Sequence, residues 1–177
     1  MSCEALADKE SMLRKAIGVL LVGFAVATNG AAQPLGEPAS DFIGRTSTGE
    51  TLRLSDYAGK VVLLDFWASW CGPCRAEMPF LVTLYDENRD APFEILAINV
   101  DTHSENAQAF LSDLGLAIPF PLIIDPDGAI PPLYDLEGMP TTVLIDAQGR
   151  VRFQHAGFRD ADKTRYRNEL QTLLDEL

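Results

Sequence analysis

The chain has 177 residues, of which 47% are hydrophobic and 23% are charged, a composition typical of a globular protein with a single domain. It carries 26 acidic and 14 basic residues, for a formal net charge of -12, which argues against nucleic acid or anionic lipid headgroups as partners. An acidic surface of this kind favours basic partners or simply solubility.

Residues 1–32 have the order of a secretory signal peptide. Arg14 and Lys15 precede twelve residues, 16–27, that contain only Ala, Gly, Val, Leu, Ile and Phe, and small residues follow up to Ala32. This order predicts cleavage before Gln33. The mature chain is then expected in the periplasm or another extracytoplasmic compartment.

A retained membrane anchor is the alternative interpretation of the same segment. Twelve apolar residues are fewer than the ~20 that a membrane span needs. In either case Arg14 and Lys15 stay on the cytoplasmic side and the rest of the chain is delivered outside. Met12 stands just before the signal and is an alternative start to Met1.

The three cysteines divide into Cys3, which lies ahead of the apolar segment of the signal, and the pair Cys71 and Cys74. Once the signal is removed, only this pair remains. A structural disulfide gains stability by closing a long loop, and a Cys71–Cys74 bond would close a very short one. The spacing therefore favours a chemical role over a structural one.

Residues 33–41 are rich in proline and glycine and predict a spacer before a domain at 42–177. A hairpin is expected over 41–54, turning at Thr48 and Gly49. The run at 61–67 is then apolar except for one aspartate, which is typical of a buried central strand.

The cysteine pair follows this strand directly, and helical spacing predicts a helix over 73–88 that kinks at Pro79 without ending there. A second strand is expected at 93–100. A helix should follow, with Ser104 as its N-cap and Gly115 just past its end.

Short strands are expected at 121–124, 141–145 and 151–154, the last two forming a hairpin. Asp160 is expected to cap a final helix, whose core-facing residues would be Tyr166, Leu170, Leu173, Leu174 and Leu177. Alternating strands and helices followed by a hairpin and a helix predict an α/β fold, with a mixed central sheet covered on both faces.

A Cys-x-x-Cys that follows a buried strand and opens a helix has a physical logic. Three residues of separation put both sulfurs on one side of the first helical turn, so they can form a disulfide. Cys71 lies where free backbone N–H groups and the helix dipole favour an anion, so it is the expected nucleophile. Cys74 is the expected resolving thiol. Pro73 suits the first helical turn, which needs no N–H there.

These residues resemble those of a known family. The stretch Val-Val-Leu-Leu-Asp-Phe-Trp-Ala-Ser-Trp-Cys-Gly-Pro-Cys at 61–74 resembles the thioredoxin superfamily, and Arg-Ala-Glu-Met-Pro at 75–79 resembles its exported ResA/TlpA-type reductases. The resemblance extends from about Pro34 to Leu177. It implies a thioredoxin-like three-layer fold with an N-terminal β-hairpin and a helix–strand unit inserted around 104–124.

The resemblance also implies a substrate-binding face. Pro140 would be a cis-proline facing the disulfide, and the backbone of Met139 would pair with an extended substrate segment. Trp67, Trp70 and Gly72 would form the rim of the site, with Pro73 beside them.

Two acids are candidates for moving the proton of Cys74. Asp65 interrupts the apolar strand at the position of the buried acid of thioredoxins, and burial should raise its pKa or require a partner. Glu77 lies three residues after Cys74 on the same helix face and matches the acid of the exported reductases. We place Asp65 first because a strand residue beneath the motif is better shielded, and a surface charge is the alternative for Glu77.

The sequence offers no metal or cofactor site. His103 and His155 lie far from the cysteines and at no zinc-finger spacing, and haem attachment would need a histidine where Arg75 stands. Asp125 and Asp127 lack the rest of a calcium loop and predict a turn.

The expected activity is therefore that of an exported thiol:disulfide oxidoreductase that reduces protein disulfides and is recharged by a membrane thiol electron donor. By resemblance, its substrates could include apocytochrome c or a copper-site protein. A disulfide oxidase, a thiol peroxidase of the related peroxiredoxin branch and a redox-inactive binding module are the alternatives.

Overall fold

The computed structural model describes residues 35–177. The expected signal peptide at 1–32 and the first residues of the expected spacer lie outside the described residues. Within them, no helix is long and apolar enough to cross a membrane.

A five-stranded mixed sheet forms the centre of the domain, in the order β5-β4-β3-β6-β7. β3 runs parallel to β4, and β4 runs parallel to β5, whereas β6 is antiparallel to both β3 and β7. The strands are β3 (Val61–Trp67), β4 (Phe93–Asn99), β5 (Leu122–Ile124), β6 (Thr141–Ile145) and β7 (Val151–Ala156). The predicted mixed sheet is confirmed.

β3 is the central strand, and all seven of its residues are buried. Side chains alternate along a strand, so its two sets of apolar residues belong to different cores. Val61, Leu63 and Trp67 pack against the helices, and Val62, Leu64 and Phe66 face the opposite layer. Asp65 belongs by this alternation to the helical face.

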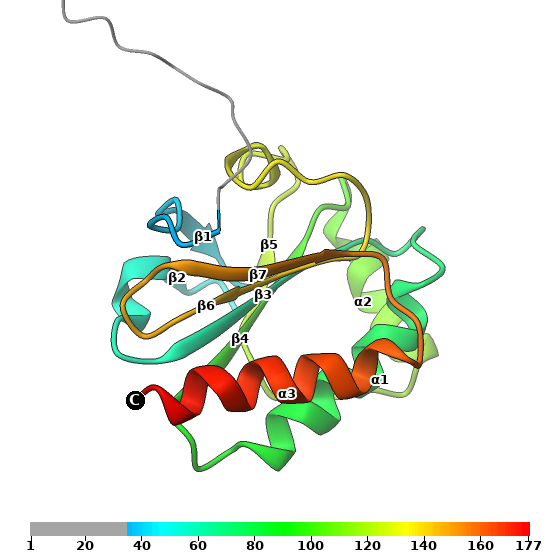
Figure 1. Ribbon diagram of the computed structural model, residues 1–177. Helices are drawn as coiled ribbons and strands as arrows, with labels where there is room; N and C mark the ends of the chain where they lie inside the picture. Colours follow the sequence, from blue (N-terminus) through cyan, green and yellow to red (C-terminus); the bar gives the residue numbers. More distant parts are fainter. Residues whose placement is uncertain (1–34) are drawn as a thin grey trace, which may run out of the picture.

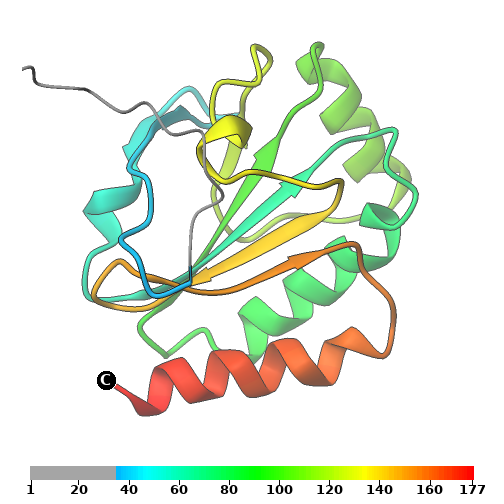
Figure 2. The same cartoon turned by 45° about the horizontal axis from the view of Figure 1, so that its top comes forward.

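Three helices pack on one face of the sheet: α1 (Cys74–Glu87), α2 (Ser104–Asp113) and α3 (Asp162–Asp175). Figure 1 shows α1 and α3 side by side below the sheet, and Figure 2 shows α2 next to the start of α1. The hairpin β1 (Ile43–Arg45)/β2 (Thr51–Arg53) and two 3-10 turns, η1 (Leu54–Tyr57) and η2 (Pro131–Leu133), lie with the other face. Helix α1 continues through Pro79, as predicted.

The N-terminal hairpin extends the sheet at its β5 edge. Thr46 forms a bridge with Ile123, and the Ser47 N–H donates to the Leu122 carbonyl at 2.8 Å. The close approach requires Gly44, because a Cβ there would lie 2.8 Å from Cγ2 of Ile123.

The segment before the hairpin is hydrogen-bonded to the far end of the sheet. The N–H of Gly36 donates to the Val151 carbonyl at 2.6 Å, and that of Ala39 to the Gly149 carbonyl at 2.8 Å. The guanidinium of Arg150 also donates to the Gly36 carbonyl. Residues 36–41, which the sequence assigned to a spacer, are thus bonded to the domain.

Three details at helix ends differ from the sequence prediction. Ser104 is the first residue of α2, and His103 with its extended backbone occupies the N-cap position. Asp160 does not cap α3. The carboxylate at this helix start belongs to Asp162, which accepts the N–H of Arg159 at 2.8 Å. Leu177 lies past the end of α3 and is 56% exposed, so it is not a core residue.

Candidate active site

Cys71 and Cys74 form a disulfide at the first turn of α1. Cys71 is the last residue before the turn and Cys74 the first of the helix, and their side chains are almost fully buried. The Cys74 N–H donates to Cys71 Sγ at 3.2 Å. This contact and the helix dipole both favour negative charge on Cys71, because free N–H groups at a helix start stabilise an anion.

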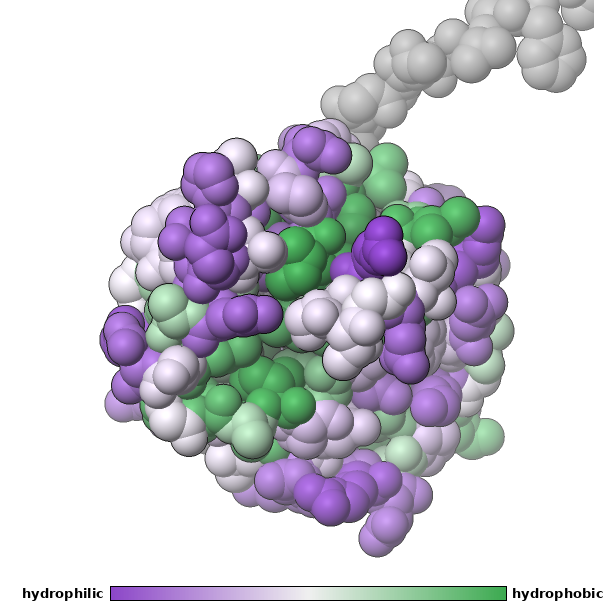
Figure 3. Space-filling model, turned by 180° about the vertical axis from the view of Figure 1, so that it is seen from behind, coloured by the Kyte–Doolittle hydropathy of each residue, from purple (hydrophilic) through white to green (hydrophobic). Residues whose placement is uncertain are grey.

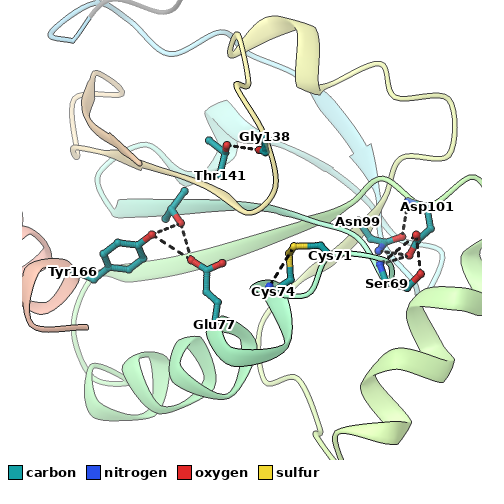
Figure 4. Close-up of a disulfide and its surroundings, with 10 residues drawn as sticks. Ser69, Cys71, Cys74, Glu77, Asn99, Asp101, Gly138, Thr141 and Tyr166 are labelled. Atoms are coloured by element: carbon teal, nitrogen blue, oxygen red, sulfur yellow. Dashed lines mark hydrogen bonds between the residues drawn. A yellow bond between two sulfur atoms is a disulfide. The ribbon is translucent and has the colours of Figure 1, made fainter. Parts of the chain in front are cut away.

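The loop that carries Cys71 is fixed to the end of β4. The carboxylate of Asp101, which is 2% exposed, accepts the Ser69 N–H at 3.0 Å and the Ser69 hydroxyl at 3.0 Å. Asn99 donates its side-chain amide to the same carboxylate at 2.9 Å. Figure 4 shows this group beside the disulfide. This group was not predicted, although a polar Asn-x-Asp at the end of a buried strand is a signal for it.

The Met139–Pro140 bond is cis, as predicted. The Pro140 carbonyl accepts the N–H of Gly157 at 2.7 Å, and the Thr141 hydroxyl donates to the Gly138 carbonyl at 2.7 Å. These bonds fix the loop before β6 from both sides. Pro140 is buried and Met139 half-buried.

The expected rim residues have different environments. Trp70 is 70% exposed beside Cys71, and Gly72 and Pro73 are exposed between the cysteines. Trp67 is fully buried and packs against Phe110 in a tilted arrangement with ring centroids 5.1 Å apart, so its assignment to the rim was wrong. The reason is its place on β3, where alternation points it into the helical core.

The two candidate acids lie in one buried cluster. Asp65 is fully buried, and neither of its carboxyl oxygens has a hydrogen-bond partner among the described residues. Its neighbour on β6 is Thr142, directly opposite in the antiparallel register. Glu77, at 1% exposure, is also buried, so the alternative of a surface charge is wrong.

The carboxyl of Glu77 is held by two hydroxyl groups. The Thr142 hydroxyl donates to Glu77 Oε1 at 3.0 Å, and the Tyr166 hydroxyl donates to the same oxygen at 3.2 Å. Figure 4 shows Glu77 reaching from α1 towards Tyr166, with its other oxygen on the side of the disulfide. The sequence placed Tyr166 on the core face of its helix but gave no sign of this polar contact.

Burial changes the proton affinity of both acids. It raises the pKa of Glu77 to about 7, although the hydroxyls of Thr142 and Tyr166 act in the opposite direction. Burial, with the nearby Glu77 charge, raises the pKa of Asp65 well above its usual value. Because both carboxyls are buried and the Glu77 charge opposes ionisation of Asp65, the pair favours a state with at least one proton at neutral pH.

The remaining candidate residues are the two histidines and the aspartates of the turn at 125–128. His155 Nε2 lies 2.7 Å from a Glu169 carboxylate oxygen, and His103 is exposed. The Asp125 carboxylate accepts the backbone N–H groups of Ala129 and Ile130, which closes the predicted turn. In the described part of the chain, no three His, Cys, Asp or Glu side chains are grouped to hold a metal ion.

Several hollows lie on the surface of the described chain, and two of them flank elements named above. A cavity of about 500 Å³ opens beside Pro73, with His155 and Phe158 in its lining. A larger groove of about 940 Å³ lies between the β1/β2 hairpin and the segment from α2 to β5, and no candidate site residue lines it. In the view from behind, hydrophobic surface gathers in the middle of the face, with hydrophilic groups around it (Figure 3).

Residues 35–154 match the model of the AhpC/TSA family. The chain belongs to this family. The thiol-disulfide oxidoreductase ResA of Geobacillus kaustophilus is 37% identical over 148 residues, covering 80% of this chain and 84% of that protein. ResA of Geobacillus thermodenitrificans is 39% identical over 125 residues, 71% of each chain.

Among solved structures, the thiol:disulfide interchange protein DsbE of Chlorobium tepidum has a TM-score of 0.77 and 40% identity, covering 81% of this chain and 99% of that one. These comparisons confirm the predicted thioredoxin-like fold and the resemblance to ResA. With its paired cysteines, this member of the family is a thiol:disulfide oxidoreductase.

Proposed function

We propose that the protein is a reductase of protein disulfides that acts outside the cytoplasmic membrane. The observation that carries this proposal is the Cys71–Cys74 disulfide at the start of α1, on the helix that also bears the buried Glu77. Gly72 and Pro73 form the dipeptide found in thioredoxin. This favours a potential near roughly -270 mV over the roughly -120 mV of a strong oxidant such as DsbA.

In the proposed cycle, the Cys71 thiolate attacks one sulfur of a substrate disulfide. A Cys71–substrate bond forms, and the second substrate sulfur leaves as a thiolate that takes a proton from solvent. Cys74 then loses its proton and attacks Cys71 Sγ. The Cys71–Cys74 bond forms, the mixed disulfide breaks, and the substrate is released with two thiols.

We propose Glu77 as the group that takes the proton of Cys74. Glu77 follows Cys74 by three residues on one helix face, and its pKa of about 7 suits both uptake and release of a proton at neutral pH. Burial and the Glu77 charge raise the pKa of Asp65 well above its usual value, and we propose that Asp65 keeps its own proton. This assignment reverses the order that shielding alone suggested.

The proposed substrate face consists of Trp70, Gly72, Pro73 and the Met139–Pro140 segment. Exposed Trp70 and the cavity beside Pro73 supply apolar surface for an extended segment of the substrate. The family implies disulfide-containing substrates. We further propose a membrane thiol electron donor, no resident cofactor, and export by the N-terminal segment. Cysteines of apocytochrome c or of a copper-site protein are candidate targets.

The deciding experiment is the redox potential of the Cys71–Cys74 couple, measured in glutathione and dithiothreitol buffers. We expect a value near roughly -270 mV, and a value near roughly -120 mV would reject the reductase in favour of an oxidase. A thiol peroxidase would instead consume peroxide after reduction. Full function of a Cys71→Ser variant in cells would support a redox-inactive binding module.

A further inference from the structure

Tyr166 connects the last helix of the fold to the acid beside the disulfide. Its hydroxyl lies 3.2 Å from Glu77 Oε1 and 2.8 Å from the Thr142 hydroxyl, which itself lies 3.0 Å from the same carboxyl oxygen. The three groups come from α1, β6 and α3 and form a closed triangle. All three residues are buried.

The triangle distinguishes the two oxygens of Glu77. Each hydroxyl has one proton to donate, and an ionised carboxylate only accepts, so the carboxylate draws both protons to Oε1 and the 2.8 Å contact between the two hydroxyl oxygens is then left without a proton. Oε2 is buried and has no hydrogen-bond partner among the described residues. In Figure 4 this second oxygen lies on the side of Cys71 and Cys74. Oε2 is therefore the open position for a proton.

We propose that Tyr166 is a positioning residue for the redox reaction: its hydroxyl anchors Glu77 Oε1, so that the exchangeable proton is carried on Oε2, facing the cysteine pair. The proposal rests on the role of Glu77 proposed above. In the resolving step, the Cys74 S–H bond breaks and its proton goes to Oε2. The Cys74 thiolate attacks Cys71, and the substrate sulfur leaves with the bonding electron pair.

The ring of Tyr166 is fixed independently of its hydroxyl. It packs against Phe80 and Phe158, each with centroids 5.9 Å away, and stacks on the His155 ring at 5.4 Å. Burial and the Glu77 charge raise the pKa of the Tyr166 phenol, so it remains an O–H donor across the working range of pH. Removing the hydroxyl alone should therefore preserve the packing.

Other titratable groups around Glu77 do not replace this donor. Asp65 on β3 and Asp162 at the start of α3 are acids, and the Asp162 charge acts to raise the pKa of Glu77. His155 on β7 is engaged by Glu169 at 2.7 Å. Thr142 and Tyr166 are the hydroxyl donors recorded on Glu77 in the described chain, and both lower its pKa.

The test compares wild type with Tyr166→Phe and with Tyr134→Phe. Tyr134 is a matched control because its buried hydroxyl donates to the Ser40 carbonyl at 2.6 Å and its ring belongs to the core on the opposite face of the sheet. Reduced protein is mixed with Ellman's reagent in a stopped-flow instrument. The first release of thionitrobenzoate reports attack by Cys71, and the second reports resolution by Cys74.

We expect the pH midpoint of the second phase to rise by about one unit in Tyr166→Phe, the shift that loss of one charge-assisted hydrogen bond produces. Tyr134→Phe should keep the wild-type midpoint. An unchanged midpoint in Tyr166→Phe, while Glu77→Gln abolishes the pH step, overturns the positioning role alone. If Glu77→Gln keeps the wild-type step, the proposed role of Glu77 fails and the inference fails with it.

A second measurement applies if Tyr166→Phe does not fold. Wild-type protein in which tyrosine is replaced throughout by 3-fluorotyrosine has a more acidic phenol at position 166, which donates more strongly to Glu77. A stronger donor should lower the midpoint of the second phase. An unchanged midpoint in a folded, fluorinated protein would contradict the proposal.

Discussion

Replacing Glu77 with Gln should remove much of the pH dependence of stability between pH 4.5 and 7. In the unfolded chain Glu77 ionises near 4.5, whereas in the folded protein its pKa is about 7. Between these values the folded state holds more protons, so the free energy of unfolding falls as pH rises. Each unit of pKa difference corresponds to about 1.4 kcal/mol, so the fall is about 3 kcal/mol in total.

The assay is urea unfolding of the oxidised protein at several pH values from 4 to 8, since disulfide-bonded cysteines do not titrate. The matched control is Glu87→Gln, the same substitution on the same helix. The Arg167 guanidinium lowers the pKa of Glu87, which is exposed, so this variant should keep the wild-type slope above pH 5. A Glu77→Gln variant that also keeps the wild-type slope would refute the reasoning, because burial of Glu77 would then not oppose its ionisation.

Three further predictions concern the site and its support. Cys71→Ser should abolish reduction of insulin disulfides, whereas Cys74→Ser should accumulate a mixed disulfide with substrate that is visible on a non-reducing gel; equal turnover by both variants would contradict the assigned roles. Asp101→Ala should lower the free energy of unfolding by about 3 kcal/mol in urea, because it removes the buried acceptor of two Ser69 hydrogen bonds; a loss within error would show that this contact is not needed. Gly44→Ala should lower the free energy of unfolding by about 1–3 kcal/mol, because the new Cβ would contact Ile123. This loss should be smaller in an Ile123→Ala background, which lacks the opposing Cγ2 atom.

The sequence predicted the sheet well because its central strands have distinctive patterns. β3 was expected at 61–67 and has those bounds, since a strand buried on both faces is almost continuously apolar. Helix starts were less predictable. Ser104 was a reasonable N-cap, but the extended backbone of His103 places the start one residue earlier than the side-chain preference implied.

The candidate site was predictable only where residues are close in sequence. Cys74 and Glu77 share helix α1 and Cys71 lies three residues before Cys74, so their spacing predicted that they lie together. Tyr166 contacts Glu77 although the two residues are 89 positions apart in the sequence. The helical spacing of Tyr166 with its apolar neighbours predicted only an ordinary core residue. The prediction for Trp67 was wrong for the opposite reason. Its nearness in sequence to Cys71 suggested a rim position, whereas the alternation of side chains along β3 directs it into the helical core.

The attachment of residues 36–39 to the β6–β7 turn places the N-terminal segment and the disulfide at opposite ends of the sheet. Pro140 and the disulfide lie at the end of β6 that begins with Thr141, whereas Gly36 is bonded at the other end, where Ile145 meets Val151. The two ends are about 13 Å apart along β6 alone. Any support that holds the chain ahead of Gly36 would therefore attach at the end of the sheet opposite the disulfide, and exposed Trp70 would lie at the end left accessible to a partner.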